Sequence, residues 1–130
     1  MPARLASVRS APNRADAAAV VSKACVRAAG ILGLNQTTLA RVLGLSAPTI
    51  TRLHAGTYVL TADSKPYELA LLLIRLFRGL DALMNGEEAS VQSWMWAPNL
   101  ALGDVPAALI TNVAGLVETV AYVDSARARV

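Results

Sequence analysis

The sequence has few residues of the kinds that support cross-links, β-strands or membrane spans. Its single cysteine, Cys25, cannot form an internal disulfide, and in its Ala/Val-rich surroundings we expect a buried, unreactive thiol. Aromatic residues make up 5% of the 130 residues, and no strand-like alternation is present. The longest uncharged apolar run, residues 69–74, is too short to cross a bilayer. Without a disulfide framework or a signal-peptide pattern, the expected protein is all-α, cytoplasmic and free of the membrane.

Motifs that carry catalysis are also missing. The sequence contains no carboxylate pair, metal-ligand spacing, glycine-rich phosphate loop or nucleophile elbow. The only histidine, His54, is expected to pack or to face a phosphate rather than to act as a catalyst. We therefore predict a protein that is not an enzyme and that uses no metal and no cofactor.

Basic residues are absent from residues 79–126, which hold six acidic ones. Residues 1–65 contain eight Lys/Arg and two Asp/Glu, a net charge of +6, whereas residues 66–130 contain four and seven, a net charge of −3. A basic front half suits a polyanion such as DNA. DNA would repel the acidic rear half, which suggests another role for it. The alternative is that the split is ordinary surface charge without meaning.

Apolar residues are in excess for so short a chain. They make up 55% of it, with a mean hydropathy of +0.45. This much apolar surface is hard to bury inside one small core, so an additional interface is expected. The apolar stretch of residues 69–77 buries its additional face either against the same chain or against a second copy, and we favour a homodimer.

Apolar spacing of three and four, N-capping Asn and Ser residues and C-terminal glycines predict a series of helices. Residues 1–12, with two prolines and no apolar period, are expected to form a loose basic arm. The first predicted helix starts near Asn13 or Asp16 and runs to about Leu32. The others cover residues 36–43, 47–55, 65–84, 87–96, 106–110 and 112–126. The first is expected to bury Val20 or Val21, Ala24, Ala28 and Ile31. The last is expected to bury Val113, Leu116, Val117, Val120 and Val123.

The stretch QTTLARVLGLSAPTITRLHAG, residues 36–56, has the pattern of a helix-turn-helix. Ala40 supplies the small residue where two helices cross, and Gly44 supplies the turn. Four apolar residues hold the second helix against the first: Leu39, Leu45, Ile50 and Leu53. This pattern resembles the lambda-repressor-like, or Xre-type, helix-turn-helix.

The resemblance implies that this unit binds operator DNA, with the exposed face of residues 47–55 in the major groove. The positions that would hold the DNA backbone are Gln36, Thr37, Thr38 and Arg41. The positions that would face the bases are Ala47, Pro48, Thr49, Thr51 and Arg52. Only Arg52 can make a bidentate contact with guanine, so the prediction is DNA binding with modest base readout. The alternative is a helix-turn-helix that has lost DNA binding.

A second motif, SWMWAPNLALGDVPAALITNVAGLVETVAYVD, occupies residues 93–124. It resembles the C-terminal domain of Xre/MbcA/ParS antitoxins, which binds RES-domain toxins. The matching residues are Trp94, Pro98, Asn99, Leu102, Gly103, Pro106, Leu109, Ile110, Thr111, Gly115 and Val120. Because the helix-turn-helix precedes this motif in the same order as in that family, the resemblance covers about residues 20–126. It implies a partner that is a NAD-consuming toxin.

Within this second motif we expect Trp94, Leu102 and Leu109 to build the core. The residues predicted to contact the toxin are Trp96, Asn99, Asp104, Arg127 and Arg129. Aromatic residues such as Trp96 concentrate at interface hot spots. The tail with Arg127 and Arg129 is either disordered or reaches into the toxin, where an arginine suits a site for pyrophosphate or an acidic residue.

The predicted organisation is a helix-turn-helix domain over residues 13–63, a connecting and dimerising helix over 64–84, and a toxin-binding domain over 85–130. Two functions fit it. The first is an antitoxin that neutralises a RES-domain toxin and represses its own operon. The second is a stand-alone Xre-type repressor whose C-terminal half only dimerises. The motif from Trp94 to Gly115 favours the first.

Overall fold

The structure is a computed structural model that describes residues 13–129, and within them it contains helices and no strand. The predicted all-α class is therefore confirmed, while the predicted basic arm, residues 1–12, lies outside the described residues. The helices are α2 (Arg14–Leu32), α3 (Gln36–Leu43), α4 (Ala47–Ala55), α5 (Lys65–Leu83), α6 (Glu88–Trp96), α7 (Pro106–Leu109) and α8 (Val113–Ala128). None of these helices is both long enough and apolar enough to cross a membrane.

Most helix boundaries are encoded by local signals. Five helices begin at an Asn or Ser whose side chain accepts a backbone N–H of the first turn, which satisfies one of the free donors there. These N-caps are Asn13, Asn35, Ser46, Ser64 and Asn112. Helices α2, α3 and α4 each end at a glycine in the left-handed conformation, as helices commonly do. Such short-range signals explain why the predicted boundaries lie close to the observed ones.

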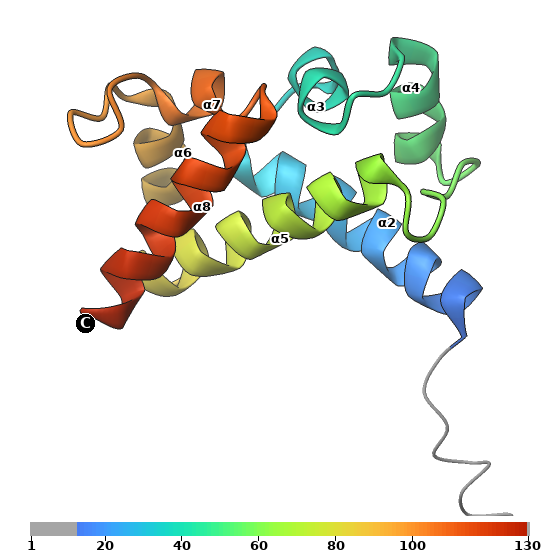
Figure 1. The fold of residues 1–130 in the computed structure, drawn as a ribbon, viewed down its shortest axis with the longest axis horizontal. Coiled ribbons are helices and arrows are strands. Elements are labelled where there is room, and N and C mark those ends of the chain that lie inside the picture. Colours follow the sequence, from blue (N-terminus) through green and yellow to red (C-terminus); the bar gives the residue numbers. More distant parts are fainter. Residues whose placement is uncertain (1–12, 130) are drawn as a thin grey trace, which may run out of the picture.

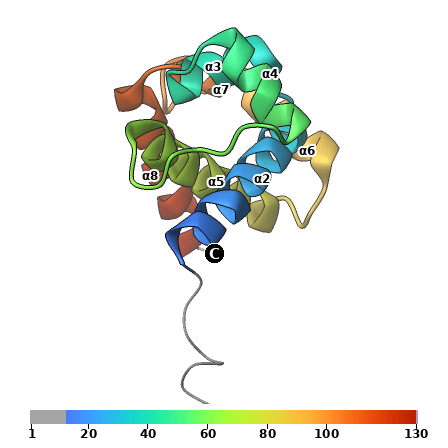
Figure 2. The same cartoon turned by 90° about the vertical axis from the view of Figure 1, so that its right-hand side faces the viewer.

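Helix α5 is the central element of the fold. It packs along α2 on one side and against α8 on the other (Figure 1). Helices α3 and α4 lie above α2 and α5 in both views (Figures 1 and 2). Helices α6 and α7 and the connection between them form the left-hand end in Figure 1. Helix α5, which was predicted as a connecting and dimerising helix, is the element on which both halves are assembled.

A single core runs through both halves of the chain. One contiguous cluster joins Cys25 of α2, Leu39 of α3, Ile50 of α4, Leu73 of α5 and Leu116 of α8. All five side chains are buried almost completely. The helix-turn-helix and the C-terminal part consequently share their hydrophobic stabilisation, because neither has a separate core.

The predicted inner face of α2 is partly wrong. Of the two alternatives Val20 and Val21, Val20 is 66% exposed and Val21 packs against the core. Ala28 is buried as predicted, Ala24 and Ile31 are half-buried, and the unpredicted Ser22 is buried. The Ser22 hydroxyl donates to the carbonyl of Ala18 at 2.7 Å and accepts the amide of Leu60 at 2.9 Å. These two bonds offset the cost of burying the hydroxyl. Apolar spacing cannot identify a buried serine, because its partner lies 38 residues away.

The predicted inner face of α8 also needs correction. Leu116, Val120 and Val123 are buried as predicted, but Val113 and Val117 are exposed. Gly115 and Thr119 occupy the inner positions instead. Thr119 can be buried because its hydroxyl donates to the carbonyl of Gly115 at 2.7 Å. Valine and leucine residues point in several directions around α8, so the sequence does not show which of them face the core until the helices packed against α8 are known.

Candidate DNA-binding and partner-binding surfaces

The predicted helix-turn-helix is formed by α3 and α4. Gly44 adopts a left-handed conformation with φ of 69° between them, and Ser46 caps α4. Leu39, Ile50 and Leu53 are buried, as their proposed locking role requires. Leu45, the fourth locking residue, and Ala40, the small residue at the helix crossing, are half-buried and pack against the same core.

The four residues predicted to hold the DNA backbone lie on α3. Gln36, Thr37 and Arg41 are exposed, while Thr38 is half-buried. The Gln36 side-chain oxygen accepts a hydrogen bond from the Thr51 hydroxyl at 3.1 Å. This contact links the first residue of α3 to the exposed face of α4, and the same hydroxyl also lies 3.1 Å from the carbonyl oxygen of Ala47. A residue predicted to contact the DNA backbone and a residue predicted to face the bases are thus positioned together.

The base-facing positions of α4 present few long side chains. Ala47, Pro48, Thr51 and Arg52 are exposed, but Thr49 is half-buried. The Thr49 hydroxyl lies 2.8 Å from that of Ser46 and accepts the Arg52 guanidinium at 3.3 Å. Arg52 therefore lies back along its own helix. It has to release one exposed hydrogen bond before it can reach a guanine, a small cost for an exposed neutral acceptor.

Two cations that are not among the predicted DNA-binding residues lie beside α4. Lys23 and Arg27 of α2, together with His54 at the end of α4, line a cleft of about 350 Å³. His54 is exposed, and its Nδ1 lies 3.1 Å from the carbonyl of Ile50. The i, i+4 spacing of Lys23 and Arg27 places both on one face of α2. From this spacing, a basic surface on α2 next to the helix-turn-helix could have been predicted.

The connection between α6 and α7 is a compact loop built around Asn99. The side-chain oxygen of Asn99 accepts the amide of Leu102 at 3.1 Å, and its backbone carbonyl accepts the amide of Gly103 at 2.8 Å. The amide of Asn99 donates to the carbonyl of Asp104 at 3.1 Å. Asn99, one of the predicted partner contacts, therefore has a structural role in this loop. Asp104 is exposed, and its carboxylate accepts the amide of Val105 at 2.6 Å.

The two tryptophans of α6 have different environments. Trp94 is half-buried and stacks on Tyr122 of α8, with ring centroids 6.4 Å apart. Trp96 is 49% exposed, and its indole N–H donates to the carbonyl of Leu32 at 3.3 Å. Trp96 therefore ties α6 to the end of α2 while leaving much of its ring accessible. This matches the predicted division between a core Trp94 and an accessible Trp96.

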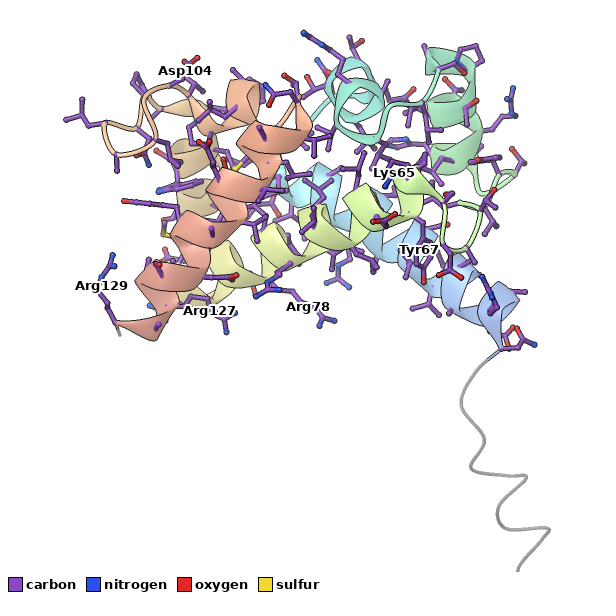
Figure 3. The ribbon with its side chains drawn as sticks, viewed as in Figure 1. Lys65, Tyr67, Arg78, Asp104, Arg127 and Arg129 are labelled. Carbon is purple, nitrogen blue, oxygen red and sulfur yellow. The ribbon has the colours of Figure 1, made fainter. Side chains whose placement is uncertain are left out.

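The five predicted partner contacts do not converge on one place. Asp104 lies at the upper end of the C-terminal part, and Arg127 and Arg129 lie at the opposite end, on the last turn and end of α8 (Figure 3). Because α8 continues to Ala128, Arg127 belongs to a helix and not to a disordered tail. The structure thus separates an upper surface, with Trp96, Asn99 and Asp104, from a lower arginine pair.

The upper surface adjoins the helix-turn-helix. A cleft of about 580 Å³ separates α3 from α7 and is lined by Thr38 and Arg41 on one side and by Trp96, Val105 and Ala108 on the other. The 97–105 loop lies on the same side of the molecule as α3 and α4 (Figure 1). Two of the proposed DNA-backbone residues therefore border the proposed partner surface.

Taken together, a helix-turn-helix with an accessible second helix and an attached helical part with accessible apolar groups define a DNA-binding protein that also binds a protein partner. The family model of the antitoxin Xre-like helix-turn-helix domain matches residues 11–75, and that of the antitoxin Xre/MbcA/ParS C-terminal toxin-binding domain matches residues 79–129. The chain belongs to this family of antitoxins, with both domains in the predicted order. A comparison with curated proteins found no match.

Proposed function

We propose that this antitoxin neutralises a RES-domain, NAD-consuming toxin by direct binding and represses its own operon by binding DNA. The observation that carries the proposal is the occurrence of both family segments, residues 11–75 and 79–129, on one shared core. The toxin class comes from the resemblance of residues 93–124 to antitoxins with RES-domain partners. The protein itself acts by binding alone, in the cytoplasm, without a cofactor.

For DNA, the proposed contacts are those of α3 and α4. Gln36, Thr37, Thr38 and Arg41 hold the backbone, and Arg52 reads a base next to the shorter Ala47, Pro48, Thr49 and Thr51. With one strong base reader per chain, a homodimer that engages two half-sites would supply the missing affinity. The exposed Leu71 of α5 and Val113 and Val117 of α8 support such a dimer.

For the toxin, the proposed contacts are Trp96, Asn99 and Asp104 on the upper surface and Arg127 and Arg129 on the lower one. Their separation supports a partner that either embraces the C-terminal part or uses only one of the two surfaces. Asn99 would act through the shape of the loop that it builds. The arginines would suit an anionic or nucleotide-binding region of the toxin.

The alternative function is a stand-alone Xre-type repressor whose C-terminal half only dimerises. Co-expression with the product of the neighbouring gene separates the two functions. The antitoxin proposal expects that the neighbour alone arrests growth, that co-expression restores growth, and that the two proteins co-purify. If the product of the neighbouring gene is not toxic and does not co-purify with this protein, the stand-alone repressor is the better-supported function.

The DNA surface is tested separately with promoter DNA. Arg52→Ala and Gln36→Ala are expected to weaken operator binding by about tenfold each. Arg78→Ala is the control, since Arg78 is an exposed cation on α5, on the side of the molecule away from α3 and α4 (Figure 3). Wild-type binding should also weaken steeply as salt increases. Equal affinities for all three variants would show that the reading surface lies elsewhere.

A further inference from the structure

The most exposed large apolar side chain of the described residues is Leu100, in the turn of the 97–105 loop. Its relative exposure is 100%, compared with 44% for Leu71 and 49% for Trp96. Leu100 contributes nothing to the core, so folding does not require an apolar residue there. An apolar side chain presented entirely to water is a disadvantage unless a partner buries it.

The loop holds Leu100 in a defined place. Hydrogen bonds within the loop close it on both sides of Leu100: Asn99 accepts from Leu102 and Gly103, and it donates to Asp104. Gly103 adopts φ of 88°, a left-handed conformation that permits the return of the chain. Since these bonds exist before any partner arrives, binding through Leu100 loses little loop entropy.

The surroundings of Leu100 indicate the chemistry of the partner. The half-buried Val105 lines both the hollow beside Leu100 and the cleft that contains Trp96, so the two exposed side chains border hollows that share one apolar residue. Asp104 lies exposed on the same loop, and residues 79–126 contain no Lys or Arg. A complementary surface would therefore be an apolar socket with basic residues at its rim.

We infer that Leu100 is an anchor residue that inserts into an apolar socket of the toxin, with Asp104 facing a basic residue at the rim. The inference rests on the proposed function, since the occupant is the toxin that residues 79–129 bind. It adds a residue that neither the motif nor the charge pattern had selected. The Leu100 side chain is the part that inserts, a preformed knob, and the hydrogen-bonded 97–105 loop holds it in position.

The test measures binding of full-length variants to the neighbouring-gene RES-domain toxin, immobilised in an inactivated form. Leu100→Ala is expected to weaken binding by roughly 10- to 100-fold, through faster dissociation, because a buried leucine side chain contributes that much. Leu100→Met, which keeps the apolar volume, should stay within roughly threefold of wild type. Thermal unfolding should be the same for all three proteins, since Leu100 touches no core residue.

Val20→Ala is the matched control, because Val20 is 66% exposed but lies on α2. If Leu100→Ala binds the toxin as tightly as Val20→Ala does, the anchor is refuted while the proposed function stands. If Leu100→Ala instead lowers self-association in sedimentation and leaves toxin binding unchanged, the knob belongs to an interface between copies and the inference is wrong. If wild type fails to bind the toxin at all, the proposed function falls and the inference with it.

Discussion

At the residue scale, Gly115 shows how closely two elements approach. A Cβ at this position would overlap the backbone carbonyl of Leu109, which precedes α8 by only a short turn. Backbone cannot move aside as a flexible side chain can. The glycine of the C-terminal motif is therefore required by packing between α7 and α8, whatever its part in partner binding.

Gly115→Ala is expected to lower the free energy of unfolding by about 2–4 kcal/mol through this overlap. Gly30→Ala is the control. Gly30 lies in α2, and nothing lies within 4 Å of the position of its Cβ. Alanine there should raise the free energy of unfolding by up to about 1 kcal/mol through helix propensity. Urea denaturation measures both, and equal effects would contradict the packing explanation.

The fold changes the titration of Cys25. Burial raises the pKa of its thiol from 9.0 to about 12, because a thiolate is poorly solvated in the core. The thiol is consequently neutral and unreactive in the folded protein, as expected from its surroundings in the sequence.

The raised pKa predicts a loss of stability at alkaline pH. Below pH 9 the thiol is neutral in both states, and its contribution is fully present. Between pH 9 and about 12 the unfolded chain ionises first, so the free energy of unfolding decreases with pH. Cys25→Ala lacks this contribution, so the stability difference between wild type and variant should shrink over that window. Urea denaturation at pH 8, 9 and 10 checks this, and parallel pH curves would refute it.

At the scale of elements, the helices differ in how they begin. Asn112 caps α8 by accepting the amide of Gly115 at 2.8 Å. Glu87, at the corresponding position of α6, makes no side-chain capping bond. Long-range packing has to define the start of α6, whereas the start of α8 is encoded locally.

Asn112→Ala is therefore expected to lower the free energy of unfolding by about 1 kcal/mol. Glu87→Ala, the matched control at an N-cap without a side-chain bond, should change it by less than about 0.5 kcal/mol. Thermal and urea unfolding of the two variants provide the comparison. A loss at Glu87 as large as that at Asn112 would count against local capping as the cause.

At the scale of the whole molecule, the shared core predicts cooperative unfolding. Both tryptophans, Trp94 and Trp96, lie in α6 and report on the C-terminal part. Most helical residues lie in α2, α3, α4 and α5, so helicity reports mainly on the N-terminal part. Because α5 packs on both α2 and α8, the two halves should unfold together. Tryptophan fluorescence and far-ultraviolet circular dichroism should therefore give one urea midpoint. Fluorescence that changes at lower urea than helicity would indicate two independent domains.

The whole molecule also places the proposed DNA surface next to the upper of the two proposed toxin surfaces. The cleft between α3 and α7 joins Arg41, a proposed DNA contact, to Trp96, a proposed toxin contact. The split between a basic front half and an acidic rear half would favour DNA on the α3–α4 side. A bound toxin would nevertheless lie close to the operator.

The sequence by itself determined the helices, their order and the family. Capping residues, terminal glycines and apolar spacing act within a few residues, so Asn35, Gly44 and Ser46 could be interpreted without the fold. The second motif, residues 93–124, could likewise be identified from the sequence because its residues lie close together in the chain.

Only the tertiary structure decided which faces are buried and which predicted contacts meet. Ser22 is buried because Leu60, far along the chain, supplies an amide, and Val113 and Val117 are exposed because Gly115 takes the inner position. Asp104 and Arg127 lie at opposite ends because α8 runs the full length of the C-terminal part. These outcomes depend on contacts between distant segments, which no local spacing encodes.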